Sequence, residues 1–409
     1  MNADRRFVAR MEYSGRDRPR VLTRCSGAGI IATSITESEA RMTLGERIPL
    51  SRPGQTAVRA RRRPLAAGAT TLALLAAATV FARGRPLSAQ GLTLVGYADL
   101  EANVEKLGST NREFYFDNYH VNLIMVGKIT GKLFAAVEVE YEHAGDEIAL
   151  EYGYLGYTGL KDVRILAGKF IVPFGRFNKD LHPTPIKKIP FRPHGFAEIL
   201  PQTYSDVGVW VSVAKALNDE NRIVLDGFVV NGLLGEDGAG IRSMRDNDRE
   251  QADFGRDDNK AVGGRVGLEM PFVGLDFGGS VYTGKYAESS QGLGLNLTLL
   301  GVDAAYRKAG FTLRGELVRA SQDASAGDLT KTGGYLEASY LINGRVEPVL
   351  QYSAQNMPAG AADVSRLALG VGFVISPAST VRLAYAVNRE KSGFKNDNNA
   401  IVAQFNVLF

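Results

Sequence analysis

About sixteen segments of this sequence alternate apolar and polar residues with a period of two. A period of two places successive side chains on opposite faces of a β-strand. In segment 381–388, for example, Val381, Leu383 and Tyr385 alternate with small or polar residues. The segments are 92–103, 112–128, 133–143, 148–158, 163–172, 204–215, 221–231, 260–270, 273–285, 293–308, 310–321, 331–342, 345–356, 363–375, 379–390 and 398–409. Each reaches the length of about 9–11 residues that a tilted strand needs to cross a bilayer.

The connections between these segments alternate between short and long. The short ones are 130–132, 160–162, 218–220, 271–272, 309–310, 343–344 and 377–378. The longer ones are 104–111, 144–147, 173–203, 232–259, 286–292, 322–330, 357–362 and 391–397. Short turns on one side and longer loops on the other are typical of an outer-membrane barrel, whereas a soluble β-sandwich has no reason to alternate its loop lengths. The sequence therefore predicts an all-β fold, a transmembrane antiparallel β-barrel of about 16 strands over residues 90–409.

Charge divides the chain into two parts. Of the 48 Lys and Arg and 44 Asp and Glu, residues 1–89 contain 16 basic and 6 acidic, which leaves 32 basic and 38 acidic residues after position 89. The barrel segment is therefore acidic overall, although the whole chain has a formal charge of +4. Nucleic-acid binding is not predicted, because it requires a clustered basic face.

The segment 61–89 has the pattern of a secretory signal peptide. Three arginines at 61–63 precede an Ala- and Leu-rich run over 65–81, and Ala89 is a small residue at the expected cleavage position. A transmembrane helix is the alternative, but this run is shorter than the roughly 20 apolar residues of a span. Residues 1–60 show no sustained period and are predicted to be a disordered extension ahead of a start site that lies downstream, near Met42 or Val58.

The last strand suggests how the chain reaches its membrane. Ile401, Phe405 and Phe409 fall on one face of the segment 400–409, which ends in phenylalanine. A final strand of this kind resembles the recognition signal of the bacterial barrel assembly machinery. With the signal peptide, it predicts export to the bacterial outer membrane, where lipid and lipopolysaccharide would surround the barrel.

The loop 173–203 is unusually long for a compact domain, and loops of this length are commonly functional. It is too apolar for a solvated tail, with Phe174, Phe177, Phe191 and Phe196 among its residues. We therefore expect it to fold into the lumen as the third outer loop and to narrow the barrel. Its basic residues are Arg176, Lys179, Lys187, Lys188 and Arg192, against Asp180 and Glu198. Basic residues at a constriction favour anions, whereas on the outer surface the same residues would bind lipopolysaccharide phosphates.

The polar face of the predicted strands carries charges of both signs. The residues expected to line the lumen include Arg164, Arg265, Arg314, Arg382, Glu138, Glu140 and Glu316. Charges are tolerated in a polar lumen and are costly toward lipid, so this face predicts a water-filled passage. For most of these residues, a structural salt bridge between neighbouring strands is the alternative role. Loop 232–259, rich in acidic residues, is expected to be an exposed cover or a site for divalent cations.

Two sequence blocks resemble the phosphate-selective porin O and P family of bacterial outer-membrane porins. They are Leu166–Gly175 (LAGKFIVPFG) and Tyr204–Trp210 (YSDVGVW). The resemblance implies a 16-stranded barrel, usually a homotrimer, that passes anions. It also implies that basic residues of the third loop form the anion-binding constriction, and Lys179, Lys187 and Lys188 lie in the matching region.

These features are compatible with different functions. The first is passive diffusion of small hydrophilic solutes, with a preference for phosphate-like anions. The second is a specific channel for sugars or organic acids, in which Trp210 and the loop aromatics form an apolar track. The third, a barrel enzyme, is disfavoured because no nucleophile–base motif, G-x-S-x-G, H-E-x-x-H or Walker sequence occurs. No cofactor is predicted, and a metal site from Asp180, His182 and His194 is not favoured by their spacing.

Overall fold

The computed structural model describes residues 10–11, 21–22, 91–105, 113–196, 199–235, 237–238, 241–242, 260–286, 294–358, 363–390 and 398–409. The chain divides into two compact units, 1–84 and 85–409. In the first unit, β1 (Arg10–Met11) and β2 (Val21–Leu22) form an antiparallel pair. The predicted signal peptide over 61–89 and the rest of the predicted extension over 1–60 lie outside the described residues. No helix among the described residues is long and apolar enough to cross a membrane.

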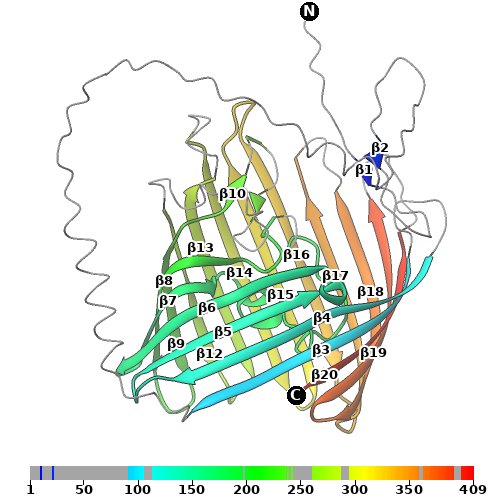
Figure 1. The fold of residues 1–409 in the computed structure, drawn as a ribbon, viewed down its shortest axis with the longest axis horizontal. Helices are drawn as coiled ribbons and strands as arrows, with labels where there is room; N and C mark the ends of the chain where they lie inside the picture. Colours follow the sequence, from blue (N-terminus) through cyan, green and yellow to red (C-terminus); the bar gives the residue numbers. More distant parts are fainter. Residues whose placement is uncertain are drawn as a thin grey trace, which may run out of the picture. The chain divides into compact units, whose positions relative to one another are not determined.

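Sixteen antiparallel strands of the second unit form a closed barrel, as the alternating pattern predicts (Figure 1). The strands are β3 (Leu92–Glu105), β4 (Glu113–Lys128), β5 (Leu133–Glu142), β6 (Glu147–Leu160), β7 (Val163–Ile171), β8 (Ser205–Ala216), β9 (Arg222–Val230), β12 (Ala261–Met270), β13 (Leu275–Lys285), β14 (Asn296–Lys308), β15 (Phe311–Gln322), β16 (Leu329–Tyr340), β17 (Val346–Asn356), β18 (Val364–Ser376), β19 (Ser379–Glu390) and β20 (Ala400–Leu408). Each strand pairs with the next along the chain, and β20 pairs with β3 to close the barrel. The C-terminal Phe409 extends this seam, because its carbonyl accepts the Gly96 N–H at 2.8 Å.

The polarity of the two faces of the barrel wall is the reverse of that in a soluble protein, which has polar residues outside and apolar residues inside. On β15, Leu313 and Leu317 are exposed on the outer face, whereas Arg314 and Glu316 are buried on the inner face. The same alternation recurs around the barrel, so the apolar residues face outward and the charged residues face the lumen. This is the arrangement that a strand in lipid requires.

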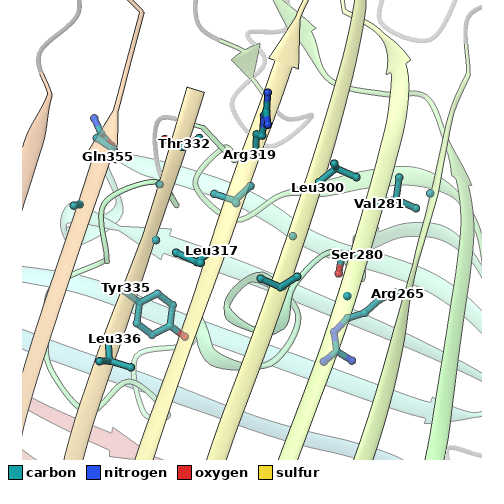
Figure 2. Close-up of a pocket in the computed structure, with 18 of the residues that line it drawn as sticks. Arg265, Ser280, Val281, Leu300, Leu317, Arg319, Thr332, Tyr335, Leu336 and Gln355 are labelled. Carbon is teal, nitrogen blue, oxygen red and sulfur yellow. The ribbon is translucent and has the colours of Figure 1, made fainter. Parts of the chain in front are cut away.

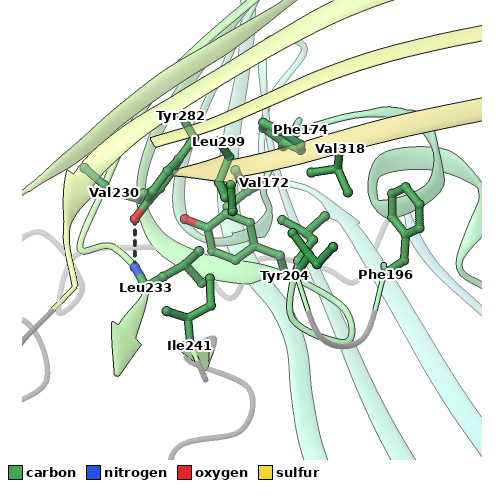
Figure 3. Close-up of a cluster of buried hydrophobic side chains, with 14 of the residues drawn as sticks. Val172, Phe174, Phe196, Tyr204, Val230, Leu233, Ile241, Tyr282, Leu299 and Val318 are labelled. Atoms are coloured by element: carbon green, nitrogen blue, oxygen red, sulfur yellow. Dashed lines mark hydrogen bonds between the residues drawn. The ribbon is translucent and has the colours of Figure 1, made fainter. Parts of the chain in front are cut away.

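The apolar core of the barrel lies inside the lumen, between loop 173–203 and the wall. One cluster joins Val172, Phe174 and Tyr204 at the ends of the loop to Tyr282 and Val318 of the wall (Figure 3). A second, smaller cluster packs Ile189 of the loop against Val349 on β17, Ala368 on β18, and Ala384 and Ala386 on β19. The predicted insertion of this loop into the barrel is therefore confirmed.

The start of loop 232–259 also enters this core, contrary to the expectation of an exposed cover. Leu233 and Ile241 are buried beside Tyr204, and the Leu233 N–H donates to the Tyr282 hydroxyl at 2.9 Å (Figure 3). The short strands β10 (Leu234–Gly235) and β11 (Ile241–Arg242) pair with each other. The acidic composition that suggested exposure comes mainly from residues 243–259, which lie outside the described residues.

Glycines on the inner wall give the loop room to approach. The cavity of about 1150 Å³ along β12–β17 is a separate feature, because outward-facing side chains such as Leu300 and Leu317 are among its lining residues (Figure 2). A Cβ atom at Gly301 would lie 3.1 Å from the Phe174 ring, and one at Gly333 would lie 2.7 Å from the Gly195 Cα. A larger residue at either position would push the loop away from the wall.

Candidate functional site

The Pro173-Phe174-Gly175 turn fixes the direction in which loop 173–203 enters the barrel. Gly175 has φ +64°, which is unfavourable for residues with a Cβ atom. Its N–H donates to Ser280 Oγ at 2.9 Å on β13. The next two N–H groups, of Arg176 and Phe177, both donate to Glu316 Oε2 on β15, at 3.1 and 2.8 Å. The turn therefore bonds the base of the loop to the inner wall.

A Gly175→Ala variant is expected to destabilise this attachment by about 1–3 kcal/mol, because the left-handed conformation is strained for alanine and Glu316 occupies the space that its Cβ would need. Chemical unfolding of the purified protein in detergent measures the loss. Gly131→Ala is the matched control, since nothing lies within 4 Å of a Cβ placed at that turn. Equal midpoints for the two variants would contradict this role of Gly175.

Asn178 and a group of aromatic rings hold the loop in shape. The Asn178 side chain donates to the carbonyls of Val172 and Tyr204 and accepts the Tyr204 N–H at 2.8 Å, so it joins the two ends of the loop. The Phe177 and Phe196 rings lie 5.3 Å apart, and both contact Tyr335 of β16. These contacts pack the loop as a unit against the wall.

Three of the five predicted constriction residues are paired with carboxylates of the wall. Arg176 contacts Asp303 at 3.3 Å and Asp276 at 3.4 Å. Lys179 Nζ lies 3.0 Å from Asp226 Oδ2. Lys188 forms an ion pair with Glu347. The structure thus gives these cations an anchoring role, with much of their charge neutralised locally.

The other two predicted residues, Lys187 and Arg192, are placed differently. Lys187 is buried and makes no salt bridge with a described carboxylate, although Asp99 and Glu101 are near enough to act on it electrostatically. Burial and the neighbouring Arg192 lower the pKa of Lys187 from 10.5 to about 8. Arg192 lies over the Phe177 ring and donates to the Phe196 carbonyl.

The two histidines of the loop, His182 and His194, contribute no positive charge near neutral pH. Burial lowers the pKa of His182 to about 3 and that of His194 to about 4. Burial raises the pKa of Asp180 above its usual value. His182 Nδ1 donates to the Asn178 carbonyl at 2.8 Å, which turns this nitrogen away from metal binding. The structure does not bring Asp180, His182 and His194 together as a metal site within the described residues.

The predicted lumen residues of the strands lie on the inner face, and several of them are paired. Arg265 donates to both oxygens of Asp303, at 2.9 and 2.6 Å. Arg314 donates to Glu337 at 2.6 Å. Arg382 reaches the loop instead, and it donates to the Thr184 and Pro185 carbonyls at 3.2 and 3.0 Å.

The remaining predicted wall residues lie on the opposite part of the wall. Glu138 and Glu140 of β5 are buried, and the Asn122 side chain donates to both. Arg164 of β7 lies over the Trp210 ring, 5.0 Å from its centroid. Trp210 itself is buried between Phe170, Lys179 and Arg164, so it does not form the exposed aromatic track considered for sugar transport.

Sequence reasoning missed the wall residues that receive the loop. Asp303 joins Arg265 of the wall to Arg176 of the loop. Gln355 accepts the Gly195 N–H at 3.1 Å, and His120 contacts the Thr184 hydroxyl at 3.1 Å. Their only sequence signal was a position on the polar face of a strand, which they share with many other residues.

Sequence comparison identifies no family and gives a match to part of the chain. No family model matches the sequence. An uncharacterized protein of Aquifex aeolicus (strain VF5) is 28% identical over 190 residues, which cover 43% of this chain and 41% of that protein. The chain therefore spans about two fifths of the length of this curated relative.

Solved structures are similar over most of the barrel. An anion-selective porin from Comamonas acidovorans has a TM-score of 0.58 at 15% identity, covering 78% of this chain and 99% of its own. OmpF of Salmonella typhi, in complex with daunomycin, has a TM-score of 0.55 at 13% identity, covering 78% and 97%. OmpT of Vibrio cholerae, an outer-membrane protein in a trimer form, has a TM-score of 0.51 at 11% identity, covering 78% and 100%.

The chain has the 16-stranded barrel fold of bacterial outer-membrane porins. The resemblance to the phosphate-selective porin O and P family stays a prediction, because these similarities concern the fold.

Proposed function

We propose that this chain is an outer-membrane porin that lets small hydrophilic solutes diffuse through a water-filled channel, with a preference for anions such as phosphate. The observation that carries the proposal is a closed 16-strand barrel with a charged inner face and a basic loop packed inside it. A barrel of this strand number encloses an aqueous channel, and a loop in the lumen narrows it.

The anion preference depends on cations that are not neutralised by ion pairs. Lys187 of the loop, Arg366 of β18 and Arg382 of β19 make no salt bridge with a described carboxylate. Most of the buried carboxylates of β3–β6 lie on other strands than these arginines, and Asp99 and Glu101 of β3 act on Lys187 without forming an ion pair with it. Anions would therefore pass beside Lys187, Arg366 and Arg382, where the positive charges are not held in direct ion pairs.

The cellular setting belongs to the same proposal. The signal peptide over 61–89 would direct export, and the C-terminal strand would be read by the barrel assembly machinery. The barrel would then reside in outer-membrane lipid with lipopolysaccharide around its loops. A homotrimer is supported by the trimer form of a structure with the same fold.

The reversal potential in a planar bilayer under a KCl gradient tests the proposal. The protein is expected to conduct and to prefer chloride at neutral pH, and Lys187→Gln is expected to weaken that preference. A protein without conductance would overturn the channel proposal. A cation-selective channel that Lys187→Gln leaves unchanged would overturn the anion preference alone.

The preference for chloride is also expected to fall as the pH rises from about 7 to about 9. A lysine with a pKa of about 8 is charged below that value and neutral above it, so the constriction loses a positive charge over this range. Arg192 and Arg382 act on Lys187 to lower its pKa, and Asp99 and Glu101 act to raise it. Lys187→Arg is the matched control, because arginine stays charged and should remove the pH dependence while keeping the preference. The same pH dependence in Lys187→Arg would assign the effect to another group.

A further inference from the structure

A histidine and three carboxylates lie side by side on the inner wall, outside loop 173–203. His120 on β4 pairs in register with Asp99 on β3 and with Glu142 on β5, and Glu140 lies two residues from Glu142 on the same face. All four side chains are buried. Three adjacent strands therefore hold these groups in one row across the wall.

The contact with Asp99 orients the imidazole of His120. His120 Nδ1 lies 3.1 and 3.2 Å from the two Asp99 carboxylate oxygens. A carboxylate at Nδ1 favours the tautomer with its proton on Nδ1, which leaves the Nε2 lone pair available. Nε2 faces Glu142 Oε1 at 3.4 Å and Glu140 Oε1 at 3.9 Å. A carboxylate behind a histidine whose other nitrogen faces further ligands is the usual outer shell of a metal site.

The spacing of the donor atoms suits one small divalent ion. The His120, Glu140 and Glu142 donors all lie within 4.8 Å of one another. Donors at about 2.0–2.2 Å from a tetrahedral zinc ion are roughly 3.3–3.6 Å apart, so small side-chain movements would bring all three to bonding distance. The Asn122 amide oxygen is buried without a hydrogen-bond partner, while its nitrogen donates to Glu140 at 3.0 Å. An unused oxygen acceptor therefore lies on a residue in direct contact with the cluster.

The negative charge of the wall formed by β3–β6 favours a bound cation. The buried carboxylates of β3–β6 are Asp99, Glu101, Glu138, Glu140, Glu142 and Glu151. Within the described residues of these four strands, no lysine or arginine is buried. Lys187 of the loop acts on Asp99 and Glu101. Buried charges of one sign are costly unless opposite charge offsets them, and a bound metal ion is commonly the largest local charge in a site.

We propose that His120, Glu140 and Glu142 bind a divalent transition-metal ion of the zinc class in the lumen, with Asp99 as the residue that positions His120. The mixed nitrogen and oxygen ligands favour such an ion over calcium or magnesium, which prefer oxygen ligands alone. The site also touches the constriction loop, because the Thr184 hydroxyl lies 3.1 Å from His120 Nδ1. This inference goes beyond conduction and does not depend on it.

Titration of the purified, untagged and EDTA-stripped protein with Co²⁺, followed by visible absorption, tests the site. The only cysteine of the chain, Cys25, lies ahead of the predicted cleavage position at Ala89, and a Cys25→Ser background removes this thiol from any uncleaved protein. We expect one Co²⁺ per chain, with the absorption of a low-coordinate ion, and full displacement by Zn²⁺. His120→Gln and Glu142→Gln are each expected to abolish stoichiometric binding. Asp99→Asn should keep the stoichiometry and weaken the affinity about 10–100-fold, as expected of a positioning residue.

His143→Gln is the matched control. His143 also contacts a carboxylate, Asp117, at 2.7 Å, but it lies more exposed at the end of the strand. This variant is expected to bind Co²⁺ like the parent protein. Heat-modifiable mobility on SDS gels shows whether each variant retains the folded barrel, and Glu142→Gln tests the site independently of His120. Absence of Co²⁺ binding in the parent protein, or binding that survives both His120→Gln and Glu142→Gln in folded protein, would overturn the proposal. Because the readout is spectroscopic, a failure here is distinguishable from a failure to conduct.

Discussion

An Asp303→Ala variant is expected to lose about 3–5 kcal/mol of its free energy of unfolding, because it leaves buried cations without their partner. Asp303 is buried and accepts two hydrogen bonds from Arg265 and one from Arg176. The Arg265–Asp303 pair joins β12 to β14, and the Arg176–Asp303 pair joins loop 173–203 to the wall. Chemical unfolding in detergent micelles, followed by fluorescence of Trp210, the only tryptophan, measures the loss.

Glu269→Ala is the matched control for this prediction. Its partner Arg222 is more than half exposed, so the pair is expected to contribute less than about 1 kcal/mol. Asp303→Asn keeps one oxygen acceptor and loses the negative charge, so its loss of stability should fall between those of the two alanine variants. If Asp303→Ala and Glu269→Ala unfolded at the same denaturant concentration, the Asp303 contacts would not stabilise the barrel as argued.

Replacing Glu316 with alanine is expected to release the base of the constriction loop. Two consecutive N–H groups, of Arg176 and Phe177, donate to one oxygen of this buried side chain. Their loss should cost about 2–4 kcal/mol, which changes the ratio of docked to undocked loop roughly 30–700-fold. Single-channel recordings should show a larger and noisier current than the parent protein gives.

Glu316→Gln separates the hydrogen bonds from the charge. Its amide oxygen can accept the same two N–H groups, so its current should remain close to that of the parent protein. A quiet Glu316→Ala channel of unchanged conductance would show that the remaining contacts, such as Gly195 with Gln355, hold the loop by themselves.

The barrel could be predicted from the sequence because a strand's periodicity is local. Segment 204–215 corresponds to β8 (Ser205–Ala216), and segment 92–103 to β3 (Leu92–Glu105), so the bounds differ by one or two residues. The alternation of short and long connections predicted that strands consecutive in the sequence are neighbours in the barrel. The apolar composition of loop 173–203 was enough to predict its burial, because an exposed loop would not contain so many aromatic residues.

The pairing of charges could not be predicted in the same way. Lys179 contacts Asp226 on β9 and Lys188 contacts Glu347 on β17, at sequence separations of 47 and 159 residues. Such partners depend on where the loop crosses the lumen, and no local pattern encodes that path. The sequence therefore indicated which residues face inward but did not separate the anchoring Lys179 and Lys188 from Lys187.

The attachment of loop 173–203 also has a consequence for the order of assembly. Apart from His120 on β4, the wall residues described above as contacts of the loop, from Asp226 on β9 to Arg382 on β19, follow the loop in the chain. The loop therefore cannot complete its contacts with the wall until most of the barrel has been synthesised and inserted. Closure of the seam between β20 and β3 brings together residues about three hundred positions apart, and such distant pairings form slowly. We expect the narrowest part of the channel to mature at the end of biogenesis, so a stalled, partly closed barrel would be leaky before it became selective.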